Sequence, residues 1–359
     1  MADGPIHNPW TPSSRLRKPA ELMKPVEESG CWFPHEIEGT DAWLYQLGGR
    51  EIADVMEAVD RVEASGCDVK DIQREDFPLP VLAPALADIK EELKDGRGFA
   101  VVRGLPIEGR SIYQNAVAYW GISTYIGRAF SQNGEGHLLG HVCDKGSTSK
   151  SLNGRGYRSA EGLGYHADGC DVTALFVLRL AKAGGQHRMC SSVALYNEML
   201  RRRPELAKAL TYNFYRSRRG EIPEGETAAW FRQPVFSVQD GYFAARGASS
   251  TLLRGAELPG VPPLTDEQRD AVSYYQTLAE ELAIDVNFEL GDIEYAQSHV
   301  TLHARTPFED WDEPERRRHL LRLWMNADGI RPLVPEIANE ITRGITVEGV
   351  ELTAPLEPV

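Results

Sequence analysis

The chain has 359 residues, of which 42% are hydrophobic and 26% are charged, and these values are ordinary for a globular protein. The formal net charge of −14 disfavours a nucleic-acid-binding protein, because phosphate contacts need a basic surface. No apolar run approaches the roughly 18 residues that a membrane-spanning helix needs, and the polar, Pro-rich residues 1–25 lack the apolar stretch of a secretory signal. We therefore expect neither nucleic acid nor a membrane as a partner.

The cysteines indicate a reducing compartment. They are odd in number, widely spaced and never arranged as C-x-x-C: Cys31, Cys67, Cys143, Cys170 and Cys190. This pattern argues against a disulfide framework and against a structural zinc site. A cytoplasmic location is the expectation that follows.

The first third of the chain predicts an arm followed by helices around one strand. Residues 1–30 contain five prolines and are expected to form an N-terminal arm. Apolar residues at three- and four-residue steps predict an amphipathic helix within residues 42–65, and further helices are expected at 82–93 and 111–126. Between these two helices, the β-rich run 98–104 is bounded by glycine and predicts a strand.

From about residue 131 the pattern changes to short apolar runs separated by glycine and polar turns. The expected strands are 138–142, 172–180, 189–195, 235–238, 243–245, 284–290, 300–303 and 319–325. Helical patterns interrupt them at 193–210 and 265–282. Many short strands at irregular spacing favour a sandwich or jelly roll. We therefore expect residues 31–359 to form a single domain that is mainly β with flanking helices.

A histidine and an aspartate two positions apart are the first candidates for a metal site. In an extended strand, His166 and Asp168 point to the same face. An imidazole and a carboxylate placed in this way can be two adjacent ligands of one divalent metal. With a second histidine they would form the two-histidine, one-carboxylate face of non-haem Fe(II) oxygenases. His-x-Asp alone is weak evidence, because the chain has nine histidines and 53 acidic residues.

A second stretch adds basic residues that are suited to an anion. Arg318 and Arg322 lie four positions apart, so on a strand they share a face and both guanidiniums can enter one cavity. A planar guanidinium is suited to binding a carboxylate with two hydrogen bonds. The alternative is a solvated surface run. We expect this for Arg316 and Arg317, but not for Arg322, which is flanked by large apolar residues.

These motifs follow one another in a fixed order. The order is His166-x-Asp168, Gly184-Gly185, Ser191-Ser192-Val-Ala-Leu-Tyr196-Asn197-Glu198, Gly291-Asp292, His303-Ala-Arg305-Thr306 and Arg318-x-x-x-Arg322. In this series the chain resembles the taurine dioxygenase/TfdA-like Fe(II)- and 2-oxoglutarate-dependent dioxygenases, including their clavaminate synthase-like branch. The resemblance runs from about Gly98 to Pro332.

The resemblance implies a double-stranded β-helix, or jelly-roll, core in a catalytic domain at residues 31–359. It implies that His166, Asp168 and His303 are the ligands of Fe(II), with 2-oxoglutarate as cosubstrate and O2 as oxidant. His299 lies four positions before His303 and would share its strand face, so it is a competing candidate. We prefer His303, because it alone is followed by Ala-Arg-Thr.

The cosubstrate site has two open questions. By resemblance, Arg318 would hold the distal carboxylate of 2-oxoglutarate, and Arg322 would contact either the cosubstrate or an anionic substrate. Several relatives carry Thr or Ser three residues after the first glycine of the Gly-Gly pair, and here that position is His187. Either His187 replaces this donor or another residue such as Ser191 serves.

Four residues in loops before the metal motif are candidates for the substrate mouth. They are Gln132, Asn133, Arg155 and Tyr157. The alternative for Gln132 and Asn133 is that their side chains cap turns. Loops of this kind carry specificity in many enzymes, so the sequence alone does not name the substrate.

The implied activity is oxidation, most simply hydroxylation, of an unactivated C–H bond in a small organic or secondary-metabolite substrate, with release of succinate and CO2. Asp168 argues against a halogenase, in which Gly or Ala at this position would leave room for halide. Desaturation, ring closure and oxidative cleavage stay open on the same scaffold. A non-catalytic jelly-roll ligand-binding protein and a zinc hydrolase are less favoured alternatives. Homo-oligomerisation is left open.

Overall fold

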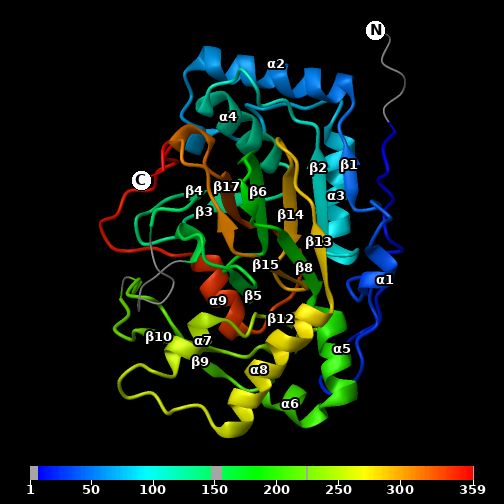
Figure 1. Ribbon diagram of the computed structural model, residues 1–359, viewed down its shortest axis with the longest axis vertical. Helices are drawn as coiled ribbons and strands as arrows, with labels where there is room; N and C mark the ends of the chain where they lie inside the picture. Colours follow the sequence, from blue (N-terminus) through cyan, green and yellow to red (C-terminus); the bar gives the residue numbers. More distant parts are fainter. Residues whose placement is uncertain (1–6, 147–155, 224, 359) are drawn as a thin grey trace.

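The computed structural model describes residues 7–146, 156–223 and 225–358, and its centre is a pair of β-sheets (Figure 1). The larger sheet has the strand order β1 (Leu44–Gln46), β2 (Phe99–Arg103), β14 (Ile293–Gln297), β6 (Val172–Arg179), β17 (His319–Asn326) and β3 (Arg128–Phe130), with β4 (Leu139–Val142) also paired to β17. All neighbours are antiparallel except β1 and β2.

The smaller sheet is antiparallel throughout. Its order is β13 (Ala283–Val286), β8 (His187–Ser191), β15 (Thr301–Arg305) and β5 (Leu163–His166). The two sheets share a buried apolar cluster, in which Phe99 and Val101 of β2 pack with Met189 of β8 and Ile284 of β13. This sandwich confirms the expected mainly β core with flanking helices.

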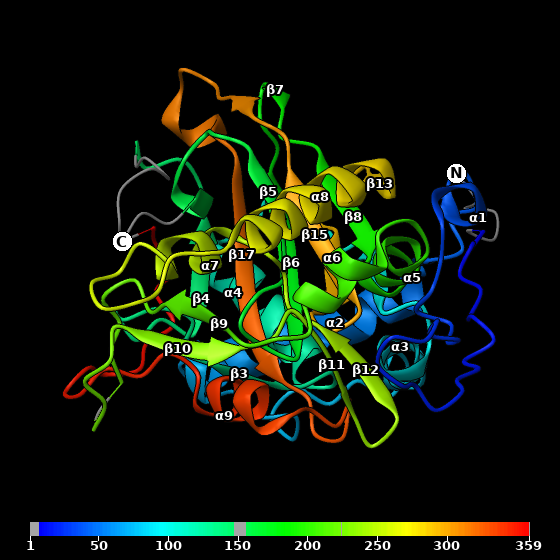
Figure 2. The same cartoon turned by 90° about the horizontal axis from the view of Figure 1, so that it is seen from below.

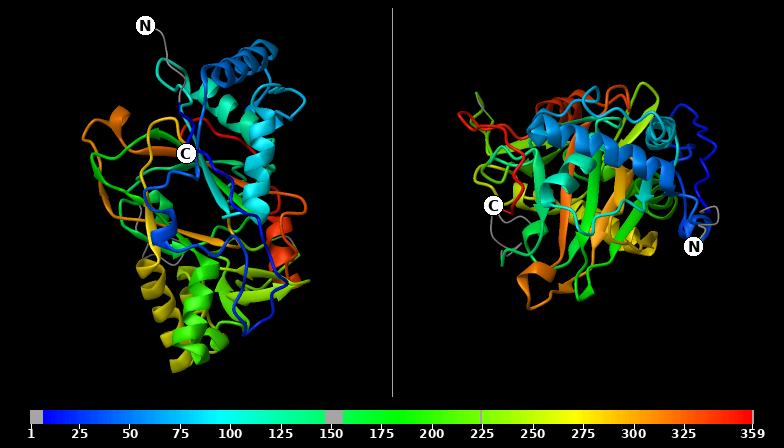
Figure 3. Two further views of the ribbon diagram at one scale, coloured as in Figure 1. Left: turned by 90° about the vertical axis from the view of Figure 1, so that its right-hand side faces the viewer. Right: turned by 90° about the horizontal axis from the view of Figure 1, so that it is seen from above.

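Helices cover the outer face of each sheet. The larger sheet packs against α2 (Gly49–Ser65), α3 (Ala83–Asp95) and α4 (Ile112–Ser123); α2 lies at one end of the molecule, and α3 runs down the side from that end (Figures 1 and 3). The smaller sheet packs against α5 (Ser192–Arg202), α6 (Pro204–Ala209) and α8 (Asp266–Glu281), which lie over its strands in the view from below (Figure 2). Each helix layer buries one apolar face against a sheet, so the inner faces of the sheets remain for the site.

Polar caps fix where several of these helices begin. The hydroxyls of Ser111 and Thr265 accept hydrogen bonds from the backbone N–H groups of Gln114 and Gln268 and so cap α4 and α8. Ser191 caps α5 in the same way through the N–H of Ala194. The expected strand 189–195 is therefore wrong after Ser191, because the cap turns the chain into a helix.

Other boundaries and elements also differ from expectation. The helix expected within 42–65 begins only at Gly49, because β1 precedes it and pairs with β2. The remaining α-helices and strands of the described residues are α1 (Pro34–Ile37), β7 (Ala183–Gly184), β9 (Phe214–Ser217), β10 (Trp230–Gln233), β11 (Phe236–Gln239), β12 (Tyr242–Ala245), α7 (Ser250–Gly255), β16 (Phe308–Glu309) and α9 (Pro335–Arg343). Of these, the sequence pattern had indicated only β11 and β12. None of the helices in the described ranges combines the length and apolar character needed to cross a bilayer.

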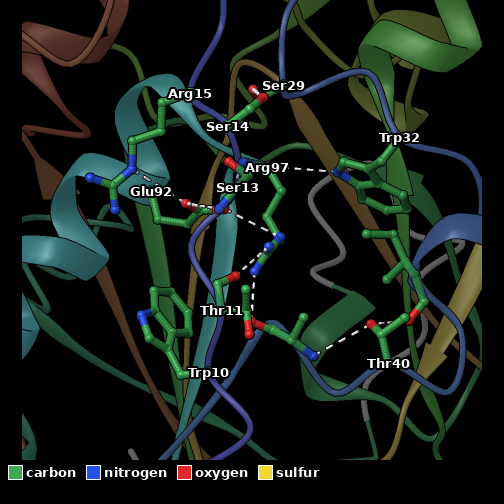
Figure 4. A network of polar contacts seen from close by, with 12 residues as sticks. Trp10, Thr11, Ser13, Ser14, Arg15, Ser29, Trp32, Thr40, Glu92 and Arg97 are labelled. Atoms are coloured by element: carbon green, nitrogen blue, oxygen red, sulfur yellow. Dashed lines mark hydrogen bonds and ion pairs between the residues drawn. The ribbon is translucent and has the colours of Figure 1, made fainter.

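The arm runs along one side of the molecule and is held by buried polar contacts (Figures 1 and 4). The backbone N–H of Ser13 donates to Glu92 Oε2 at 3.0 Å, and Arg97 Nη2 donates to the Thr11 carbonyl at 2.8 Å. Glu92 is fully buried, and its Oε1 lies 3.2 Å from Arg97 Nε. At its other end the arm places Glu28 Oε1 3.1 Å from Arg331 Nη1, again with both side chains buried.

Candidate metal centre

Two neighbouring strands of the smaller sheet bring the predicted metal ligands together. His303 of β15 is the register partner of His166 at the end of β5, and Asp168 follows two residues later. The imidazole rings are 4.3 Å apart between centroids. One potential ligand atom from each of the three residues lies within 4.8 Å of the others, so the group can hold one metal ion.

The protonation state of the two histidines is suited to binding a metal. His166 Nδ1 lies 2.8 Å from the Gly164 carbonyl oxygen, which only accepts hydrogen bonds. The hydrogen therefore sits on Nδ1, and the lone pair of Nε2 remains for a metal. Burial lowers the pKa of both His166 and His303, so both rings are neutral at physiological pH.

Asp168 is ionised despite being buried. Its carboxyl Oδ2 accepts a hydrogen bond from the Thr173 hydroxyl at 3.0 Å and lies 3.5 Å from Arg322 Nη1. Burial acts against the charged form, but the nearby charge of Arg322 helps to hold the pKa of Asp168 well below its usual value. A neutral pair of imidazoles beside a carboxylate is a suitable donor set for Fe(II).

A cavity of about 470 Å³ lies beside these three residues and contains the two predicted cosubstrate arginines. Arg318 is 4% exposed, and burial lowers its pKa to about 9. Within the described part of the chain its Nη1 has no hydrogen-bond partner. Arg322 Nε donates to Gln132 Oε1 at 2.8 Å, and its guanidinium lies 4.5 Å from the centre of the Tyr157 ring. Arg322 of β17 and Arg318, which directly precedes this strand, therefore both border the cavity beside the metal ligands.

The two alternative donors for the cosubstrate have different surroundings. His187 lines the cavity, its ring centroid is 5.8 Å from that of His303, and its Nε2 lies 2.9 Å from Glu294 Oε1. Ser191 does not line the cavity; its hydroxyl donates to the Gly30 carbonyl at 2.5 Å and caps α5. The geometry thus favours His187 over Ser191.

The four candidates for the substrate mouth separate in the structure. Tyr157 lines the cavity, whereas Gln132 is fully buried behind Arg322 and also donates to the Arg322 carbonyl at 3.0 Å. Asn133 Oδ1 accepts hydrogen bonds from two backbone N–H groups of its own loop, so this side chain caps a turn. Arg155 lies outside the described residues.

The competing histidine takes a structural contact instead. His299 is fully buried, and its Nε2 lies 2.9 Å from Asp171 Oδ1. It is absent from the cluster that can hold a metal and from the cavity wall. Its distance of four residues from His303 includes the turn before β15, so the expected shared strand face does not exist.

Further arginines in the cavity wall were not assigned by sequence reasoning. Arg216, Arg246 and Arg305 all line the cavity and are at most 5% exposed. Two signals were available: the basic run Arg216-Ser-Arg-Arg219 in an acidic chain, and the place of Arg305 in the motif that begins at His303. Arg246 shows no such pattern, and only the fold brings its Nη2 to within 2.6 Å of the Asp168 carbonyl oxygen.

Comparison with known proteins agrees with this geometry. A family model described as "Taurine catabolism dioxygenase TauD, TfdA family" matches residues 64–324, well over half of the chain. The chain belongs to this family. As a TauD/TfdA-family protein it is an Fe(II)- and 2-oxoglutarate-dependent dioxygenase, which confirms the expected enzyme class, cosubstrate and oxidant.

Two named relatives and one solved structure resemble this TauD/TfdA-family protein over most of its length. It is 31% identical over 323 residues to FR-33289 synthase of Streptomyces rubellomurinus, covering 86% of this chain and 93% of the relative. It is 28% identical over 317 residues to a taurine hydroxylase-like protein of Stachybotrys chartarum, covering 84% and 80%. An asparagine oxygenase structure with Fe(II), a hydroxyasparagine and succinate superposes with a TM-score of 0.61 at 16% identity, covering 79% of this chain and 93% of the other. The last comparison supports the jelly-roll fold.

Proposed function

We propose that this dioxygenase hydroxylates a C–H bond of a small organic substrate bound in the 470 Å³ cavity. The observation that carries the proposal is the cluster of His166, Asp168 and His303 at the wall of a cavity with buried arginines. The relatives' names support the substrate class, since one is a synthase of FR-33289 and another oxidises asparagine. A cavity of this volume suits a small metabolite with a cosubstrate.

In this proposal the metal ligands are His166 Nε2, Asp168 Oδ1 and a ring nitrogen of His303. The Gly164 carbonyl orients His166, while Thr173 and Arg322 hold the other oxygen of Asp168. Bound Fe(II) with 2-oxoglutarate and O2 supplies the oxidative decarboxylation that yields succinate and CO2. The role of the chain is to orient both organic molecules and to exclude water from the reacting carbon.

Arg318 is proposed to bind the distal carboxylate of 2-oxoglutarate, because its buried Nη1 has no partner in the described ranges. A buried guanidinium without a counter-charge is costly, and a carboxylate removes that cost. Arg322 contacts Gln132 and Tyr157, and its Nη1 lies 3.5 Å from the proposed metal ligand Asp168. It is proposed to contact the reacting end of the substrate or cosubstrate, with His187 as a further polar contact.

The decisive experiment is succinate formation by anaerobically purified protein supplied with Fe(II), 2-oxoglutarate and O2, with and without pools of candidate metabolites. We expect succinate that requires Fe(II), that a substrate stimulates and that disappears in His303→Ala. A product that gains one oxygen atom means hydroxylation, while loss of two hydrogens means desaturation or ring closure. Absence of both turnover and 2-oxoglutarate binding by the iron-loaded protein would contradict the dioxygenase assignment for this chain.

Organisation and location are also proposals. We infer that residues 31–359 act as one catalytic domain, because the core clusters combine residues from both halves of the chain. A reducing, cytoplasmic location is consistent with five unpaired cysteines. Cell fractionation with an antibody to the protein tests the location, and light scattering tests whether it forms a homo-oligomer.

A further inference from the structure

Two buried arginines on the side of the cavity away from β17 have donors without partners. Arg216 of β9 is 3% exposed and uses Nη1 to donate to the Gly247 carbonyl at 2.8 Å. Arg246 follows β12, is 5% exposed and uses Nη2 to donate to the Asp168 carbonyl. Across the described ranges, Nε and Nη2 of Arg216 and Nε and Nη1 of Arg246 have no hydrogen-bond partner.

Neither of these two guanidiniums forms an ion pair with a carboxylate of the described residues. No carboxylate of the described residues lies within 4.0 Å of either one, although both line the cavity. The acidic residues of the cavity wall have other contacts: Asp168 with Arg322, Glu340 with Arg218 at 2.8 Å, and Glu221 with the backbone N–H of Gly134. An unpaired buried charge is costly, so an anion from outside the chain is the natural partner.

The arginines lie directly against the metal-binding strand. A Cβ on Gly247 would be 2.9 Å from the Cα of His166, so the segment that carries Arg246 and holds Arg216 packs on that strand without space for a side chain. They come from the β9–β12 region, whereas Arg322 lies in β17 and Arg318 directly precedes that strand. The cavity therefore has two arginine pairs from different parts of the fold beside one metal centre.

We propose that Arg216 and Arg246 form a subsite for a doubly charged oxyanion of the substrate, such as a phosphate group. This inference rests on the proposed function, since it names the class of substrate for the same cavity. Nε and Nη2 of Arg216 lie on one edge of the guanidinium and can bind two oxygens of one anion. Two unpaired positive charges are balanced by a group of charge −2, whereas a carboxylate balances only one of them.

The test uses the full-length, Fe(II)-loaded protein under anaerobic conditions with saturating 2-oxoglutarate. Calorimetric titrations with inorganic phosphate, sulfate and acetate are compared in wild type, Arg216→Gln, Arg216→Lys and Arg232→Gln. Arg232 is a matched control, because it is exposed on the neighbouring strand β10 and does not line the cavity. We expect wild type and the Arg232→Gln control to have the same affinity for phosphate, and the same affinity for sulfate. Both proteins should bind acetate more weakly than either of these anions.

Arg216→Gln should weaken phosphate binding by about tenfold or more, the loss expected for hydrogen bonds to a charged group. Arg216→Lys keeps the charge without the paired donors and should lie between wild type and Arg216→Gln. Unchanged phosphate binding in Arg216→Gln would overturn the subsite, as would phosphate that binds only when 2-oxoglutarate is withheld, because that anion would occupy the Arg318 site. Acetate binding as tightly as phosphate would overturn the doubly charged class.

The two proposals fail in different ways. If the protein binds Fe(II) and 2-oxoglutarate and forms succinate but does not bind phosphate or sulfate, only the anion subsite is wrong. If it binds neither Fe(II) nor 2-oxoglutarate, the dioxygenase proposal fails first. Melting temperatures of all variants identify any that do not fold. If Arg216→Gln does not fold, phosphate binding is compared between wild type and Arg216→Lys.

Discussion

Arg322 Nη1 lies 3.5 Å from Asp168 Oδ2, so β17 of the larger sheet brings a cation to the carboxylate that follows β5 of the smaller sheet. Both side chains are at most 7% exposed. The same guanidinium is fixed from behind by Gln132. Arg322 thus connects the wall of the cavity to the charge state of a proposed metal ligand, and this connection can be tested.

Replacing Arg322 should shift the pH dependence of metal binding. Burial acts to raise the pKa of Asp168, and Arg322 is the strongest of the influences that lower it. Because the pKa is depressed in the folded protein, the carboxylate stays ionised below the ordinary Asp value of about 3.9. In Arg322→Gln the pKa of Asp168 rises. As the pH is lowered, Asp168 should therefore become protonated, and Fe(II) affinity should be lost, at a higher pH in the variant than in wild type.

The measurement is Fe(II) affinity between about pH 4 and pH 7 under anaerobic conditions, a range chosen to begin near the ordinary Asp pKa. Arg316→Gln is the control, because Arg316 is exposed and precedes the same strand. Coincident pH profiles for Arg322→Gln and wild type would show that Arg322 does not set the ionisation of Asp168.

Substitution of His303 should affect metal binding, whereas substitution of His299 should affect stability. His303→Gln should lose the metal, because it removes one of three ligands. His299→Gln should keep one metal per chain but lower the free energy of unfolding by about 1–3 kcal/mol, because it disturbs a buried contact with Asp171. Metal analysis and denaturant unfolding of both variants check this pattern. Metal loss in His299→Gln with metal retained in His303→Gln would reverse the ligand assignment.

Arg318→Lys should raise the KM for 2-oxoglutarate by about 10- to 100-fold, the loss expected when a charged, two-point contact becomes a single one. The kcat at saturating cosubstrate should change far less, since the residue binds the end of 2-oxoglutarate remote from the metal. Arg317→Lys is the matched control, because Arg317 is exposed and its side chain donates to the backbone carbonyls of Trp311 and Asp312 in its own loop. Equal KM values for the two variants would remove Arg318 from the cosubstrate site.

Glu92→Gln should destabilise the protein by about 3–5 kcal/mol, because it leaves the buried guanidinium of Arg97 without its counter-charge. Glu91→Gln, on the exposed face of the same helix, should change the free energy of unfolding by less than about 0.5 kcal/mol. Urea unfolding of both variants measures the difference. A loss in Glu92→Gln as small as that in Glu91→Gln would mean that the buried ion pair of Glu92 with Arg97 does not stabilise the fold.

Sequence periodicity predicted the elements whose burial is regular. The helix at 82–93 and the strands at 98–104, 172–180 and 319–325 correspond to α3, β2, β6 and β17, because each has an apolar pattern that matches one geometry. The joining of His303 to His166 and Asp168 had a different source, since the resemblance of the ordered motifs to the TauD/TfdA family implied it. Short edge elements such as β9 and β10 have little periodicity and were not found.

Contacts between segments that are distant in the sequence could not be predicted from local sequence patterns. Gln132 reads as a polar loop residue, yet it is fully buried because the side chain of Arg322, 190 residues later, meets it there. Ser191 reads as a possible ligand contact, but a local helix cap takes its hydroxyl. Arg246 has no motif, because its place beside Asp168 depends on how the β11–β12 hairpin lies against β5.

The buried pair of Glu28 and Arg331 also bears on how the protein is made. Its two residues are separated by 303 positions, so the ribosome releases Glu28 long before Arg331 exists. Such a long-range contact closes late, since the intervening chain must first be brought together. The arm, although synthesised early, is therefore among the last segments to reach its final place.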